Sequence, residues 1–142
     1  MELDEWIVQV PALLRDSPIW KVRAYQIAAF IAAEASADAA RIEQRPSYAQ
    51  VAPQLVRAVG SIGANVAEGY SRRSHRDRIR YYEYALGSAR EATSWYSLIA
   101  PTLNAGDLEH RLTCLARVAQ LLLKTIHNER NGLNHNSPRR IA

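Results

Sequence analysis

Residues 51–69 read VAPQLVRAVGSIGANVAEG, and this stretch decides the fold. Its larger apolar residues recur at steps of four, four, three and four: Val51, Leu55, Val59, Ile62 and Val66. That spacing puts all of them on one face of an α-helix, so the segment predicts a helix with one buried side. Pro53 is tolerated in a first helical turn, which places the start near residue 51. Gly69 is expected to follow the last turn and to end the helix.

Three more helical patterns flank this one. The expected helices cover residues 17–44, 51–69, 74–101 and 107–132. Residues that start or stop helices bound them: Ser17-Pro18, Arg45-Pro46, Ser74, Pro101, Asp107 and Asn131-Gly132. Because the connections are short, successive helices are expected to pack antiparallel. The sequence therefore predicts an all-α, up-down-up-down four-helix bundle over residues 17–132.

Two short segments lie outside the expected bundle. Residues 1–16 include apolar side chains that need burial, namely Trp6, Ile7, Val10, Leu13 and Leu14. Pro11 interrupts any helix there, so we expect a short helical arm. The sequence leaves open whether this arm packs on the bundle or on a neighbouring subunit. Residues 133–142 are polar and are expected to form a flexible tail.

The composition is that of a small globular protein. The chain has 142 residues, 48% of them hydrophobic, and a formal net charge of +4, which is typical of one folded domain. A single cysteine, Cys114, fits a reducing cytosol, and the acidic N-terminus differs from a basic signal peptide. No apolar stretch reaches the ~18 residues that a membrane span needs. We therefore expect a cytoplasmic protein without membrane contact.

The positive charge is concentrated in residues 71–80. This segment holds one aspartate and five arginines, namely Arg72, Arg73, Arg76, Arg78 and Arg80. It therefore carries +4, and the other 132 residues sum to zero. The planar guanidinium group suits bidentate contact with phosphate, and Tyr70, Tyr81 and Tyr84 nearby are suited to stacking on unpaired bases. The segment is thus the predicted binding site for nucleic acid, either RNA or DNA.

The alternative interpretation of this segment is a solvated turn. Its arginines would then pair with acids of the same chain, Glu68, Asp77 and Glu83, or with acids of a neighbouring subunit. The first 17 residues carry a net charge of −3 and offer a protein surface of that kind. A short basic segment alone does not separate the two interpretations.

The remaining polar candidates favour structural roles. Three residues beside the basic segment are expected to stabilise the helix end and the turn by hydrogen bonding: Asn65, Glu68 and Gly69. Glu91 is expected to meet a cation on a neighbouring helix. His110 and Cys114 lie four residues apart and can face one metal ion, but a structural zinc needs four ligands and no Cys-x-x-Cys pair completes the set. We therefore expect no metal and no cofactor.

Residues 61–70, SIGANVAEGY, followed by Arg72-Arg73-Ser74 and by ALGS at 85–88, resemble a known family. The family consists of the bacterial four-helix bundle proteins encoded within 23S ribosomal RNA intervening sequences. The resemblance continues to Glu91, and elsewhere it rests mainly on the helical pattern. This chain differs at Gly63, where the family usually has proline, and at Arg78, where it usually has an aromatic or aliphatic residue.

The resemblance implies an assembly and a class of partner. Relatives assemble as homopentameric rings of four-helix bundles. A subset is similar to the accessory proteins of diversity-generating retroelements, which bind a reverse transcriptase and nucleic acid. No catalytic activity is established for the family as a class. We therefore expect a non-enzymatic, oligomeric nucleic-acid-binding or assembly factor, with a reverse transcriptase as the implied protein partner and a purely protein-binding scaffold as an alternative.

An enzymatic alternative rests on Arg130 and His135. Their Arg-x4-His spacing, with Asn131 after the arginine, is similar to the ribonuclease motif of HEPN domains, which are also small helical bundles. In such enzymes a histidine acts as acid or base and an arginine stabilises developing charge. Gly132 is expected to end the helix within the motif, and only seven residues follow His135, so we favour the non-enzymatic interpretation.

Overall fold

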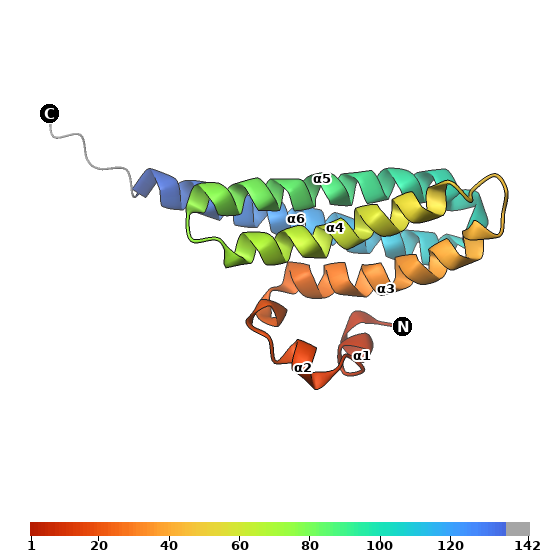
Figure 1. Cartoon of the computed structure of the whole chain (residues 1–142), viewed down its shortest axis with the longest axis horizontal. Coiled ribbons are helices and arrows are strands. Elements are labelled where there is room, and N and C mark those ends of the chain that lie inside the picture. Colours follow the sequence, from red (N-terminus) through yellow and green to blue (C-terminus); the bar gives the residue numbers. More distant parts are fainter. Residues whose placement is uncertain (136–142) are drawn as a thin grey trace, which may run out of the picture.

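The computed structural model describes residues 1–135, and four long helices dominate it (Figure 1). They are α3 (Arg23–Glu43), α4 (Val51–Ser71), α5 (His75–Ile99) and α6 (Ala105–His135). Each helix packs against the next along the chain, and α3 also contacts α6, which closes the bundle. Short connections at alternating ends make successive helices antiparallel. The predicted all-α four-helix bundle is confirmed, and the described residues contain no strand.

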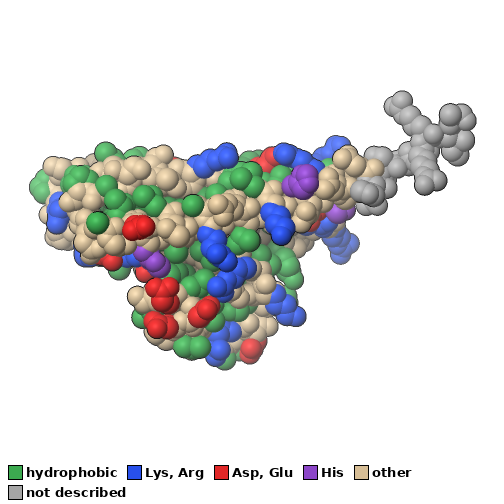
Figure 2. Space-filling model, turned by 180° about the vertical axis from the view of Figure 1, so that it is seen from behind, with side chains coloured by type: hydrophobic (Ala, Val, Ile, Leu, Met, Phe, Trp, Pro, Cys, Tyr) green, Lys and Arg blue, Asp and Glu red, His purple; other side chains and the backbone are tan. Residues whose placement is uncertain are grey.

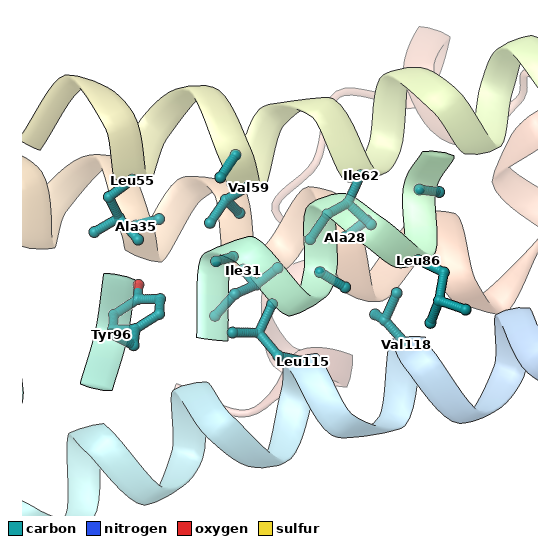
Figure 3. Packing of buried hydrophobic residues seen from close by; sticks show 14 of the residues in the cluster. Ala28, Ile31, Ala35, Leu55, Val59, Ile62, Leu86, Tyr96, Leu115 and Val118 are labelled. Atoms are coloured by element: carbon teal, nitrogen blue, oxygen red, sulfur yellow. The ribbon is translucent and has the colours of Figure 1, made fainter. Parts of the chain in front are cut away.

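The core confirms the stripe that predicted the second helix. Its five residues are all buried, and Leu55, Val59 and Ile62 are fully so (Figure 3). They meet Ile31 of α3 and Leu115 of α6, both of which are also inaccessible to solvent. Burying each such aliphatic side chain contributes about 1.5–3 kcal/mol. Small residues such as Ala28 and Ala35 are buried among them and let the helices approach closely.

The start of the first long helix differs from the prediction. Residues Pro18–Lys21 form a separate 3-10 turn, η1, and Val22 is extended with φ −85° and ψ 110°. Two contacts hold this break: Trp20 is buried, and the Gln26 side-chain amide donates a hydrogen bond to its carbonyl at 2.7 Å. The long helix α3 therefore begins at Arg23 rather than at the Ser17-Pro18 pair.

Gly69 does not end its helix, because α4 continues to Ser71. Gly69 lies within α4 with a helical backbone, and its φ is not positive. A Cβ atom added at this position would lie 2.7 Å from the ring of Tyr82 on α5. Gly69 is therefore needed for the close approach of α4 and α5, not for a left-handed helix end.

The last helix is longer than predicted at both ends. The Asn104 side chain, not Asp107, is the cap, because it accepts the Asp107 backbone N–H at 2.8 Å, and α6 begins at Ala105. The helix then continues through Gly132 to His135. A Cβ atom at Gly132 would lie 2.5 Å from the His75 ring, so this glycine also marks a close approach. Residues 133–135 belong to the helix, and the rest of the expected tail lies outside the described residues.

The N-terminal arm packs on the bundle of its own chain, the point that the sequence left open. It consists of α1 (Leu3–Ile7) and α2 (Ala12–Arg15), on the side of the bundle where α3 lies (Figure 1), and α1 contacts α3. The Trp6 ring lies 5.4 Å from Phe30 and 6.2 Å from Trp20, measured between ring centroids. These aromatic contacts are what fix the arm.

Among residues 1–135, none of the helices is long and apolar enough to cross a membrane.

Candidate nucleic-acid interface

The predicted basic segment forms the turn between α4 and α5, at one end of the bundle. Ser74 is the N-cap of α5, as expected: its hydroxyl accepts the Asp77 backbone N–H at 3.1 Å. Ile79 and Tyr82 then face the core. Arg76 and Arg80 are therefore on the exposed side of the helix.

Arg78 differs from the other four arginines because it is turned toward the protein. Its Nη1 atom donates hydrogen bonds to the backbone carbonyls of Arg72 at 3.0 Å and Arg73 at 2.8 Å. Its Nε lies 3.0 Å from Oε1 of Glu129 on α6, and only 21% of the side chain is exposed. His75 contacts the same carboxylate. Arg78 thus ties the backbone of the turn to α6 and positions its neighbours.

Arg72 and Arg80 both precede Tyr81 in the sequence, and both contact its ring. Their guanidinium carbons are 5.0 and 5.3 Å from the ring centroid, within the range of a cation–π contact. Each also has an acidic partner: Arg72 pairs with Glu68, and Arg80 lies 3.6 Å from Asp77. These two pairings are the ones that the alternative interpretation predicts.

Arg73 and Arg76 are the unpaired members of the segment. Both are exposed, and neither side chain makes a hydrogen bond or an ion pair within residues 1–135. Glu83, the third acid considered as a partner, instead contacts Arg130 on α6 at 2.5 Å. The turn therefore presents two free arginines beside two that share their charge with an acid.

Of the three residues expected to stabilise the turn by hydrogen bonding, only one contacts it with its side chain. Glu68 is at the turn, paired with Arg72. The Asn65 side-chain amide donates to the Ser61 carbonyl at 2.9 Å, one turn back in its own helix, so it does not reach the turn. Gly69 acts through helix packing, as described above.

Glu91 meets a cation on a neighbouring helix, as predicted. Its Oε1 atom lies 2.5 Å from Nη2 of Arg57 on α4 and also accepts the Trp95 indole N–H at 3.2 Å. The pair joins α4 to α5 away from the basic turn, where both side chains are partly exposed.

A buried polar network in the core escaped the sequence analysis. Asp38 is fully buried, and its Oδ2 accepts hydrogen bonds from the Tyr96 hydroxyl at 2.9 Å and from Arg111 Nε at 2.8 Å. Arg41 pairs with the other oxygen. The spacing of residues could have indicated it, because Asp38 continues the register of buried positions 31, 35 and 42 on α3. However, an acid among alanines is more typical of an exposed helix position.

The charges of this network balance one another. Burial alone would raise the pKa of Asp38, but hydrogen bonds from Arg111 and Arg41 outweigh it and hold that pKa below its usual value. Burial raises the pKa of Glu34, opposed by Arg111 Nη1 at 3.0 Å and by His110 Nε2 at 3.2 Å. Together these groups join α3, α5 and α6 inside the bundle, which is a structural role.

His110 and Cys114 do lie on one face of α6, with Nε2 and Sγ 3.9 Å apart. Burial raises the pKa of the Cys114 thiol to about 11, so it is not a ready thiolate ligand or nucleophile at neutral pH. Within residues 1–135, no cluster of three or more His, Cys, Asp or Glu side chains is arranged to hold a metal ion.

The residues of the enzymatic alternative both belong to α6. Arg130 contacts Glu83, so its guanidinium group is already engaged. His135 is the last described residue of the helix, and its side chain lies outside the description. The expectation that Gly132 would break the helix between them is wrong.

The face of the molecule seen in Figure 2, from behind the view of Figure 1, separates basic from acidic side chains. Figure 2 shows Lys and Arg side chains spread along the bundle and acidic side chains gathered on the protruding N-terminal arm. The arm carries Glu2, Asp4 and Glu5, and Asp4 lies 3.4 Å from Arg23 of α3. The acidic arm and the basic turn are therefore separate surfaces of one chain.

Comparisons with known proteins support the fold and the family. A family model described as 23S rRNA-intervening sequence protein matches residues 21–124. A crystal structure of a protein of unknown function from the S23 ribosomal protein family, from Bacteroides thetaiotaomicron, is similar with a TM-score of 0.68 and 22% identity. The alignment covers 72% of this chain and 97% of that one, and at this identity it shows the fold alone. No curated protein matches the chain.

Proposed function

The chain belongs to the 23S rRNA-intervening sequence protein family, and we propose that it is a non-enzymatic nucleic-acid-binding or assembly factor that works as a homo-oligomer. The proposed contact surface is the turn between α4 and α5. It comprises the four outward arginines, Arg72, Arg73, Arg76 and Arg80.

The observation that carries this proposal is the state of the arginines in the turn. Arg73 and Arg76 are exposed and have no acidic partner in residues 1–135, so both are available to an anionic ligand. Arg78, by contrast, already contacts Glu129 of α6 and the backbone of the turn. Unpaired guanidinium groups favour phosphate contact, because no existing ion pair has to be broken before they bind and their planar shape suits bidentate contact.

A salt series with RNA tests the proposal. If the four outward arginines neutralise about four phosphates of a single strand, log K should fall by about 2.8 for each tenfold rise in salt. The double variant Arg73→Ala/Arg76→Ala should bind more weakly and show a slope smaller by about 1.4. The matched control is Arg45→Ala/Arg117→Ala, which removes the same charge from exposed positions away from the turn. A flat salt response, or equal effects of the two double variants, would refute a phosphate-binding role for the turn.

The proposed oligomer is a pentamer, as the family resemblance implies. The outer face of α3 and α4 supports such an assembly, because a shallow hollow there is lined almost wholly by alanine and glycine, including Ala32, Gly60 and Ala64. Val56 on the same side of α4 is 41% exposed. Such a face lets another helix approach closely. Size-exclusion chromatography with light scattering should give about five times the 15.9 kDa chain mass, and a monomer would refute it.

Two alternative functions and one implied protein partner make different predictions. A purely protein-binding scaffold forms the oligomer but shows no salt-dependent nucleic-acid complex. A reverse transcriptase is the protein partner that the resemblance implies. If a neighbouring gene encodes a reverse transcriptase, the two proteins should copurify after coexpression, and the absence of a complex would contradict this partner. A HEPN-like ribonuclease degrades RNA, and His135→Ala abolishes that activity, so intact RNA after incubation with the unaltered protein excludes it.

A further inference from the structure

We infer that the basic turn takes unpaired bases of a single-stranded nucleic acid, with Tyr84 as the surface on which a base stacks, an inference that rests on the proposed function. The geometry that points to this ligand is a pair of tyrosines inside the arginine cluster. One ring is held in place by the arginines, and the other is left open to solvent.

Tyr81 is the ring held in place. Guanidinium groups of Arg72 and Arg80 lie within 5.3 Å of its centroid, and Arg72 Nη2 also donates to its hydroxyl at 3.3 Å. The ring is half-buried, so it has little free surface of its own. Tyr81 therefore orders the two arginines and gives its neighbour a rigid support.

Tyr84 is the ring left open. It stands edge-to-face with Tyr81, at 89° and 5.9 Å between centroids, and 54% of the residue is exposed. Its hydroxyl makes no hydrogen bond within residues 1–135. An aromatic side chain that is fixed by a neighbour yet open to water provides a stacking platform at low entropic cost.

Phosphate contacts and the platform follow one line along α5. Arg76, Arg80 and Tyr84 are four residues apart, so they lie on one side of the helix with a rise of about 6 Å between successive members. A single strand laid along this side meets guanidinium groups with its backbone and Tyr84 with a base. Paired bases are already stacked inside a duplex, so a duplex reaches the arginines but not the ring.

Fluorescence anisotropy with two probes separates the ring from the charges. The probes are a labelled oligouridine and a labelled RNA duplex of the same length, at one low salt concentration. Tyr84→Ala should weaken oligouridine binding by about tenfold and leave duplex binding within about twofold, because only stacking is lost. Tyr84→Phe keeps the ring and should bind both probes as the unaltered protein does. Leu123→Ala, which removes another exposed apolar side chain, serves as the control on α6 and should change neither.

The outcomes distinguish the stacking inference from the proposed function on which it rests. If Arg73→Ala/Arg76→Ala weakens both probes but Tyr84→Ala changes neither, the turn binds phosphate and the stacking inference is wrong. Equal losses for duplex and single strand in Tyr84→Ala would overturn it too. If the unaltered protein binds neither probe, the proposed function and this inference fail together.

Discussion

Replacing Asp38 by asparagine should destabilise the protein by about 3 kcal/mol. The side chain is fully buried and accepts hydrogen bonds from Arg111 and Tyr96, so the substitution keeps the shape but removes the charge facing Arg111. Breaking one partner of a buried ion pair costs about 3–5 kcal/mol, and the low end applies because Glu34 still lies 3.0 Å from Arg111. The expected fall in melting temperature is roughly 10 °C.

Urea unfolding of the variant beside a surface control tests this magnitude. Glu83→Gln removes one partner of an exposed ion pair with Arg130 and should cost only about 0.5 kcal/mol. If Asp38→Asn costs no more than Glu83→Gln, the buried network does not stabilise the bundle in the way we argue. Circular dichroism at low temperature confirms that both variants still fold.

The unaltered protein and Asp38→Asn should differ in how their stability depends on pH. The pKa of Asp38 lies below its usual value, so the stability contributed by its carboxylate is fully present above the usual aspartate pKa of about 3.9. That contribution is lost as pH falls through the lowered pKa of the folded state. The stability gap between the unaltered protein and Asp38→Asn should therefore be constant near neutral pH and narrow in strong acid. A gap independent of pH down to acid unfolding would contradict the assignment.

Three further predictions concern packing and reactivity. Gly69→Ala should destabilise by about 1–3 kcal/mol in urea, because its Cβ would press on the Tyr82 ring, whereas Gly87→Ala, at an exposed helical position with open space around it, should stabilise by about 0.5–1 kcal/mol. Glu129→Gln should cost about 2 kcal/mol by the same assay, since it removes the charged partner that anchors the basic turn; no change would show that the anchor is dispensable. Alkylation of Cys114 by iodoacetamide at neutral pH should be slower than that of a free thiol by about a hundredfold, because its pKa is about 11, and a normal rate would contradict the burial.

The sequence predicted the bundle because its strongest signal is periodic. Leu55, Val59 and Ile62 recur at helical spacing, and burial of that face needs three more amphipathic helices, which the pattern supplies. The N-cap Ser74 was also predictable, because its partner Asp77 lies only three residues away. Local patterns thus carried most of what the sequence analysis recovered, although it missed the equally local cap at Asn104.

Features determined by distant residues were not predictable in the same way. A glycine that ends a helix and a glycine that admits a neighbouring helix look alike in sequence, since both positions exclude a side chain. At Gly69 and Gly132 the deciding partners are Tyr82 and His75, which belong to another helix. Asp38 is a similar case, because an acid in a helix is read as exposed unless its partner Arg111, distant in sequence, is known.

The same distinction changes how the charge of the basic segment should be counted. The sequence assigns +4 to residues 71–80, but Arg78 is neutralised by Glu129, and Arg72 and Arg80 share their charges with Glu68 and Asp77. Two free arginines, two arginines that must exchange an acidic partner for phosphate, and one exposed tyrosine ring are a small contact surface for a single copy. Because joining several such surfaces raises the effective concentration of each after the first has bound, the proposed oligomer turns weak contacts into stable binding. The affinity for nucleic acid is therefore expected to depend on the oligomer. Dissociating the oligomer into single chains should weaken binding even when every arginine is kept.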